Sequence, residues 1–507
     1  MHHKDIKHEI RKQLKRFYPN WQRLTKKEKK AIARQVLNEV VEKHNFTQPV
    51  NTDKAQLLGL ENQAVCPGIM SIDEMAQFIN NRENDVLFRL NKTKGHPAIA
   101  DKELKLIDAL IDDGIINEIL SYDGYSPCMR EFFPATFLRA ELLKTIKYPE
   151  ISYRKFCGDD KSYSGHKLHS PYIGKECKQN RAFIGLPLNR NQMLSHIQMC
   201  QFRGSLSFAQ LVNLTVYILF QARKNGLLDQ GLVHCIDSSE LAVERQQLLA
   251  TLIIKGQKIR IYDDIDCDCG VRRKKRDKSN YVVGYRMHTL SVINPETGRC
   301  IPLMSLLAAA NHHDSQFLGP LIGLGQAIGL DLRLISADEA YNDTDGAVLA
   351  QTGVHIVTPP SAKVYLPENV DPQTLEVTCD EYCEIGMDYV GIEGQCHEFK
   401  CGAQPGECSR ADVCPQYRHI PFDGGYFQPI RHGSDAVSQA LEIRKNCERP
   451  FNLFKNREGL EEVRVRSQDG LLARVTFTTM ANLLIELVET RREIKVPAKQ
   501  QRLPFAA

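Results

Sequence analysis

Two short apolar stretches of this 507-residue chain each end in an aspartate. Asp237 follows Leu232–Ile236, and Asp338 follows Leu332–Ala337. Both stretches have the length and composition of buried strands. A carboxylate at the end of a strand is well placed to bind a hard cation, and Mg²⁺ needs only two or three carboxylates because it retains several waters. If the two strands are neighbours in one sheet, the two aspartates form one cation site. A single aspartate at the end of a strand is more typically a turn residue or a helix cap.

A third carboxylate should come from a helix packed on that sheet. Residues that follow one another at intervals of three and four lie on one side of a helix. Five residues of this segment are spaced in this way: Leu441, Arg444, Glu448, Phe451 and Lys455. Two cations and one carboxylate on one side of a helix suit a metal-bound phosphodiester. Pro450 should kink or restart this helix two residues after Glu448. The alternative third acids are Glu458, Glu461 and Glu462.

The segment 232–358 predicts the order β-β-β-α-β-α-β for the elements that position these acids. Its strands are expected at Leu232–Ile236, Tyr281–Val292, Ile301–Leu307, Leu332–Ala337 and His355–Thr358. Helices are expected from Asp314, as N-cap, to about Ile328, and at Ala347–Gln351, Ala436–Lys455 and Thr478–Arg492. This alternation predicts an α/β fold with a mixed sheet flanked by helices.

The chain divides into four regions. Residues 1–147 are expected to form a helical, basic region that contacts DNA, or a scaffold that binds nothing. It opens with helices at 4–17 and 25–44, the second begun by a capping box of Thr25 and Glu28. Residues 148–228 connect it, with a helix at Ser207–Lys224, to a catalytic domain formed by 229–360 and 431–495. Residues 361–430 form a Cys-rich insertion.

These motifs resemble those of the DDE transposases of bacterial insertion sequences, over about residues 230–490. That family carries a Tyr-x2-Arg-x3-Glu-x6-Lys signature, and Arg444, Glu448 and Lys455 match its spacing. Leu441 stands in place of the Tyr, so a DNA contact made by that Tyr does not carry over. The resemblance implies a ribonuclease H-like core in which Asp237, Asp338 and Glu448 are catalytic and hold two Mg²⁺ or Mn²⁺ ions.

The resemblance also implies a reaction and its partners. A transposase cleaves DNA at the ends of a mobile element and joins the freed 3′-hydroxyl to target DNA, and it acts as a homodimer on the DNA. The residue spacing alone supports only a nuclease, so a ribonuclease H-like nuclease without strand transfer is one alternative. A zinc-containing DNA-binding regulator with an inactive core is another.

Basic residues indicate where DNA would bind. The net charge of +4 is small, but local basic blocks on a near-neutral chain favour an anionic polymer, unless they are merely solvated. The expected DNA contacts are Arg272, Arg273, Lys274, Lys275, Arg276, Arg286, His288, Arg444 and Lys455. Histidines of this kind are more often buried or surface groups. Tyr341 and Asp343, which follow the second acid, are expected to shape its loop.

The cysteines suggest a second metal. We expect a cytoplasmic protein without a membrane segment, because no secretory leader is visible and the longest apolar stretch, Phe317–Leu330, is interrupted by polar residues and Pro. Its 16 cysteines should therefore be reduced. Six lie in the insertion, and we expect four of them to bind one structural Zn²⁺, unless they are free thiols. The four are Cys396, Cys401, Cys408 and Cys414.

Overall fold

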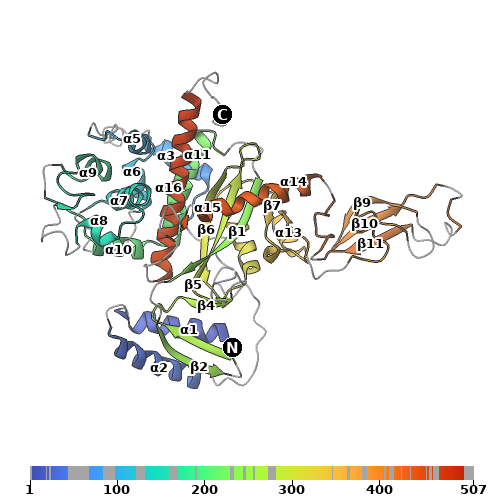
Figure 1. Cartoon of the computed structure of the whole chain (residues 1–507), viewed down its shortest axis with the longest axis horizontal. Helices are drawn as coiled ribbons and strands as arrows, with labels where there is room; N and C mark the ends of the chain where they lie inside the picture. Colours follow the sequence, from blue (N-terminus) through green and yellow to red (C-terminus); the bar gives the residue numbers. More distant parts are fainter. Residues whose placement is uncertain are drawn as a thin grey trace, which may run out of the picture.

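The computed structural model of the chain describes residues 3–43, 68–83, 98–120, 132–159, 169–228, 233–271, 281–361, 366–379, 385–409, 416–455, 460 and 467–495, apart from short gaps at 19, 22–23, 189–190, 244–246, 255–256, 345, 405–406, 424, 434 and 453. Everything below concerns these residues. Figure 1 shows a central body with two smaller units that extend from it, one next to the N-terminus and one built on β9, β10 and β11.

A mixed sheet lies at the centre of the body (Figure 1). Its strands are β1 (Val233–Ala242), β4 (Asp268–Val271), β5 (Tyr281–Ile293), β6 (Cys300–Ala309), β7 (Leu334–Ala337) and β8 (His355–Val357). β6, β5, β1, β7 and β8 lie in that order, with β4 paired to the start of β5. β5 is antiparallel to β1 and β6, whereas β1, β7 and β8 are parallel. The predicted α/β class with a mixed sheet is confirmed.

Helices cover this sheet, as predicted. α16 (Gln468–Lys495) packs against β6 and against α11 (Phe208–Lys224), while α12 (Leu318–Ala327) packs against β5 and α14 (Asp435–Arg444) against β7. α16 is long and apolar enough to cross a membrane, but 89% of its apolar window is buried inside the molecule. It is therefore placed as a core helix, and it begins ten residues before the predicted start.

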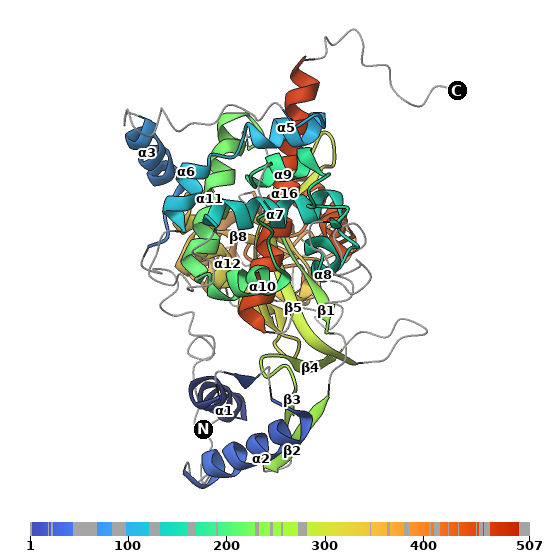
Figure 2. The ribbon, with the colours of Figure 1, turned by 90° about the vertical axis from the view of Figure 1, so that its left-hand side faces the viewer.

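Short helices on the other side of α16 form a helical body, seen best in Figure 2. They are α3 (Ile72–Glu83), α5 (Lys102–Asp108), α6 (Asp113–Ile119), α7 (Pro134–Lys147), α8 (Tyr153–Cys157), α9 (Lys178–Ile184) and α10 (His196–Ser205). α11 begins at the predicted place, where Ser207 and Gln210 form a capping box. α7 and α11 are buried on most sides, and their buried apolar residues join those of α16 in one core.

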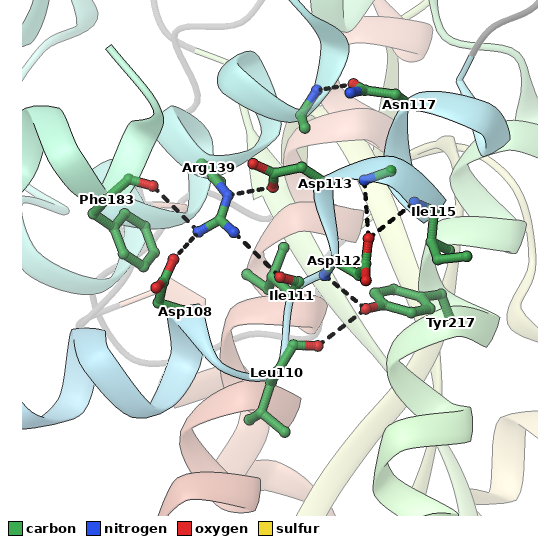
Figure 3. Close-up of polar contacts among 12 residues, drawn as sticks. Asp108, Leu110, Ile111, Asp112, Asp113, Ile115, Asn117, Arg139, Phe183 and Tyr217 are labelled. Atoms are coloured by element: carbon green, nitrogen blue, oxygen red, sulfur yellow. Dashed lines mark hydrogen bonds and ion pairs between the residues drawn. The ribbon is translucent and has the colours of Figure 1, made fainter. Parts of the chain in front are cut away.

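Arg139 holds three of these helices together (Figure 3). Its guanidinium donates to Asp108 at 2.6 Å, to Asp113 at 2.5 Å and to the Phe183 carbonyl at 3.2 Å. The hydroxyl of Tyr217 on α11 donates to the Leu110 carbonyl at 3.0 Å. A buried cation surrounded by acceptors in this way is satisfied, and it joins α5, α6 and α9 to α7.

The first two helices belong to a separate packing unit. α1 (His3–Phe17) and α2 (Lys26–Lys43) match the prediction. The predicted capping box is also present, because the Thr25 backbone N–H donates to the Glu28 carboxylate at 2.7 Å. They pack on a hairpin of β2 (Leu248–Ile254) and β3 (Gln257–Tyr262), which the sequence analysis did not predict. Lys29 donates to the Asp263 carboxylate at 2.6 Å. The predicted region 1–147 is thus divided between this unit and the helical body.

The Cys-rich insertion forms a sheet of its own that extends away from the body (Figure 1). Its strands are β9 (Met387–Glu393), β10 (Cys396–Cys401) and β11 (Tyr417–Pro421), in the order β11-β10-β9 and antiparallel throughout. A small apolar cluster that includes Phe399 and Phe427 covers one face. The insertion is therefore a folded unit with its own core.

Candidate acidic site

Asp237 and Asp338 lie next to each other on neighbouring strands. Ile236 of β1 pairs with Ala337 of β7 in parallel register, and each aspartate is the next residue of its chain. Adjacent strands are about 4.8 Å apart, so the two side chains leave the sheet on one face as neighbours. Asp338 directly follows its strand, as predicted. Asp237 lies inside β1 and not at its end, because β1 continues for five residues in register with β5.

The electrostatics of this pair favour a cation. Burial raises the pKa of Asp237 to about 7, and the neighbouring Asp338 carboxylate adds to the rise, whereas the Ser238 backbone N–H and the Arg444 guanidinium oppose it. Arg444 Nη2 lies 3.3 Å from Asp338 Oδ1. Two carboxylates that share one guanidinium retain an excess of negative charge when both ionise, so a divalent cation suits them.

The expected third-acid helix is broken. α14 ends at Arg444, a 3₁₀ turn follows at η8 (Lys445–Cys447), and α15 (Glu448–Asn452) begins with Glu448. Pro450 is tolerated in the first turn of α15 because the amides there need no helical partner. The prediction of one continuous helix over Ala436–Lys455, and of a single stripe along it, was therefore wrong: the break precedes Glu448 instead of following it.

The position of Glu448 is set by its neighbour. Cys447 is buried against Cys235, which lies two residues before Asp237 on β1. The backbone of Glu448 is thus held at the acidic pair, but its side chain is exposed. Among the described residues, Asp237, Asp338 and Glu448 do not converge within 4.8 Å of one another. The structure therefore brings together the two aspartates but not the predicted third acid.

The opposite face of β1 carries a polar network. Arg286 donates to the Asp314 carboxylate at 2.7 Å, and the Ser238 hydroxyl donates to the same carboxylate at 3.1 Å. Asp314 was predicted as a helix cap, but His313 caps η6 (Asp314–Phe317) instead. The Nδ1 of His288 lies 2.7 Å from the Tyr341 hydroxyl.

This network occupies two of the expected DNA contacts. His288 is fully buried, so it is not available to a phosphate. The Arg286 guanidinium is partly exposed but is paired with Asp314 and lies 3.6 Å from Glu240. Alternation along β5 places both on the face away from the acids, since they pair with Ser238 and Glu240. The loop-shaping prediction is confirmed for Asp343, whose carboxylate accepts two backbone N–H groups at the start of α13 (Ala347–Thr352), both at 3.0 Å.

Some predicted residues lie elsewhere. The basic run Arg272–Arg276 and Cys414 fall outside the described residues. Lys455 is half-buried, beyond α15. Cys396 and Cys401 stand at opposite ends of β10, about 16 Å apart at the usual rise of a strand, so they cannot bind the same ion. The predicted four-cysteine zinc site is therefore wrong in at least one ligand.

Sequence reasoning missed the buried thiols under the acidic pair. Cys235, Cys300 and Cys447 form one cluster beside Asp237, and they come from β1, β6 and η8. No spacing in the sequence links them. The one available signal was a Cys two residues before Asp237 and another directly before Glu448.

No protein-family model matches this chain, and no curated protein matches it. The function must therefore be argued from the acidic pair and its surroundings.

Proposed function

We propose that the chain is a DDE-type DNA transposase that catalyses metal-dependent strand cleavage and strand transfer at the ends of a mobile element. The observation that carries the proposal is the juxtaposition of Asp237 and Asp338 on neighbouring parallel strands, with Arg444 on the helix that covers them. The strand order β6-β5-β1-β7-β8 supports a ribonuclease H-like core. In that fold the central strand and its parallel neighbour carry the first two acids, as they do here.

The donor set fits Mg²⁺ or Mn²⁺, because both side chains offer carboxylate oxygens. Asp237, Asp338 and Glu448 would hold two such ions, which supply charge stabilisation for an in-line phosphoryl transfer. The protein's own contribution is to position the charged groups around the reacting phosphate. Asp237 must release its proton when a cation binds, Arg444 would provide a positive charge for a phosphate beside Asp338, and Glu448 would be the third carboxylate of the donor set.

The wider proposal follows from the sequence resemblance. The partners are element ends and target DNA, the active form is a homodimer on DNA, and the protein is cytoplasmic. Sequencing the DNA that flanks the gene should reveal terminal inverted repeats.

A strand-transfer assay with those repeats tests the reaction. Wild-type protein with Mg²⁺ should join a pre-cut end to a target plasmid, and Asp237→Ala or Asp338→Ala should bind the ends without cutting or joining them. Cleavage without joining by the wild type would indicate the nuclease alternative. Tight binding without any metal-dependent cleavage would indicate the regulator.

A further inference from the structure

The turn that follows Asp338 is attached to the sheet by one buried hydroxyl. Tyr341 ends the 3₁₀ turn η7 (Glu339–Tyr341) and is fully buried. Its backbone N–H donates to the Asp338 carbonyl at 2.8 Å, and the Asp338 carboxylate accepts the Glu339 N–H at 2.8 Å. Asp338 is therefore held by β7 on one side and by Tyr341 on the other.

The Tyr341 hydroxyl contacts the strand that pairs with the strand of the first acid. It lies 2.7 Å from His288 Nδ1 on β5. His288 pairs directly with Ser238 of β1, the residue after Asp237. This hydroxyl thus connects the turn after the second acid to the position on β5 that lies opposite the residue after the first acid.

His288 and its neighbour Ser238 are themselves held in place. The His288 ring stacks on Phe317 with centroids 3.9 Å apart, and it is neutral because burial lowers its pKa well below the usual value. Ser238 donates to Asp314, which Arg286 holds at 2.7 Å. The charged groups facing the contact are therefore paired with each other.

We propose that Tyr341 and His288 are positioning residues that set the place of Asp338 relative to Asp237, and so the affinity of the acidic site for its divalent cation. This inference rests on the proposed metal site. Side chains that orient metal ligands typically contribute 10–100-fold to metal affinity. Neither residue is itself a metal ligand in this proposal, because His288 lies on the face of the sheet opposite the acids and the Tyr341 hydroxyl contacts it there.

The test is direct Mn²⁺ binding, measured by the electron paramagnetic resonance signal of free Mn²⁺, without DNA. Tyr341→Phe should raise the dissociation constant about tenfold or more. Tyr217→Phe is the matched control, since its buried hydroxyl is also hydrogen-bonded, at 2.9 and 3.0 Å, but in the helical body. It should bind Mn²⁺ as the wild type does. His288→Phe removes the partner of the Tyr341 hydroxyl, keeps an aromatic ring to stack on Phe317, and should weaken binding in the same direction.

Unchanged Mn²⁺ affinity in both Tyr341→Phe and His288→Phe would overturn the inference, as would equal weakening in Tyr217→Phe. If Tyr341→Phe does not fold, His288→Phe decides. The proposed function fails separately: a wild type that binds Mn²⁺ through Asp237 but neither cuts nor joins DNA would refute the transposase and leave the positioning role intact.

Discussion

At the scale of single residues, Asp237 is a carboxylate held where ionisation is unfavourable. Its pKa rises to about 7 because it is largely buried and because Asp338 lies beside it. An unfolded aspartate titrates near 3.9, so the folded protein binds this proton more tightly than the unfolded chain does. The tighter proton binding stabilises the folded state fully below about pH 4, and this contribution to the free energy of unfolding is lost as the pH rises toward 7. Above pH 7, without metal, the ionised site destabilises the fold.

Replacement of Asp237 by Asn should therefore stabilise the metal-free protein at pH 8, by up to about 4 kcal/mol. The reason is that Asn keeps the shape and removes the buried charge. Urea denaturation in a chelating buffer between pH 4 and 8 measures this, and the advantage of Asp237→Asn should grow across that range. Asp388→Asn, which removes an exposed carboxylate, should change nothing. Parallel pH profiles for Asp237→Asn and wild type would contradict the prediction.

At the scale of elements, the third acid depends on a break between two helices. The 3₁₀ turn η8 directs Cys447 into the core and leaves Glu448 as the first residue of α15. The neighbouring Cys447 packs against Cys235 of β1, which keeps the start of α15 beside the strand that carries Asp237. The alternatives Glu458, Glu461 and Glu462 lie outside the described residues.

We predict that Glu448→Gln reduces cleavage by more than the roughly 10–100-fold that loss of an indirect metal partner costs. The change keeps the shape of the side chain and removes one ligand charge. Glu442→Gln is the control, because Glu442 is also exposed and lies on α14. An assay that joins a pre-cut DNA end to target DNA in the presence of Mg²⁺ measures the activity of both variants. Normal activity in Glu448→Gln, together with an inactive Glu458, Glu461 or Glu462 variant, would assign the third acid elsewhere.

The helical body depends on Arg139 in a way that can be measured. Removal of one member of a buried charged network leaves its partners uncompensated, so Arg139→Ala should cost about 3–5 kcal/mol. Arg223→Ala should cost at most about 1 kcal/mol, because Arg223 and its partner Asp73 are exposed. Thermal denaturation followed by circular dichroism compares the two. Equal melting temperatures would mean that Arg139 does not hold the body together.

At the scale of the whole molecule, two small units extend from one body that carries the acidic pair (Figures 1 and 2). The basic run Arg272–Arg276 follows β4 in the sequence and lies outside the described residues. We predict that its positive charges contact DNA phosphates.

Neutralising all five residues of this run should weaken DNA binding for every sequence. It should reduce the slope of log affinity against log salt by up to about 4, since each phosphate contact contributes about 0.9. Titrations at several salt concentrations measure the slope. Neutralising Lys102 and Lys105, exposed on α5, should leave it unchanged. A slope that does not respond to the basic run would make that run a solvated loop.

The insertion sheet makes the zinc prediction more specific. Because Cys396 and Cys401 are separated by the length of β10, only one of them can contribute to a site with Cys408. We predict that Cys401→Ser and Cys408→Ser each release zinc, whereas Cys396→Ser retains it. Elemental analysis of protein purified without chelators tests this. A wild type without zinc, or loss of zinc from Cys396→Ser alone, would refute it.

The elements that depend on local chemistry could be predicted from the sequence. The Thr25–Glu28 capping box, the strand Tyr281–Ile293 and the short helix α13 depend on neighbours within one or two turns, so periodicity and capping residues were enough. The second acid, which follows a short apolar strand, was found in the same way. Asp237 was expected to end its strand, whereas β1 continues for five residues beyond it.

Tertiary structure decided what depends on distant partners. The β2–β3 hairpin forms where α1 and α2 cover it, and Leu248–Ile254 offers no alternation that would reveal this. His288 and Arg286 resemble DNA contacts in the sequence, yet strand pairing turns them away from the acids and gives them internal partners. The sequence by itself determined which carboxylates could bind a cation. Only the sheet order decided which of them meet, because pairing between remote strands is chosen by the burial of the whole core and not by local pattern.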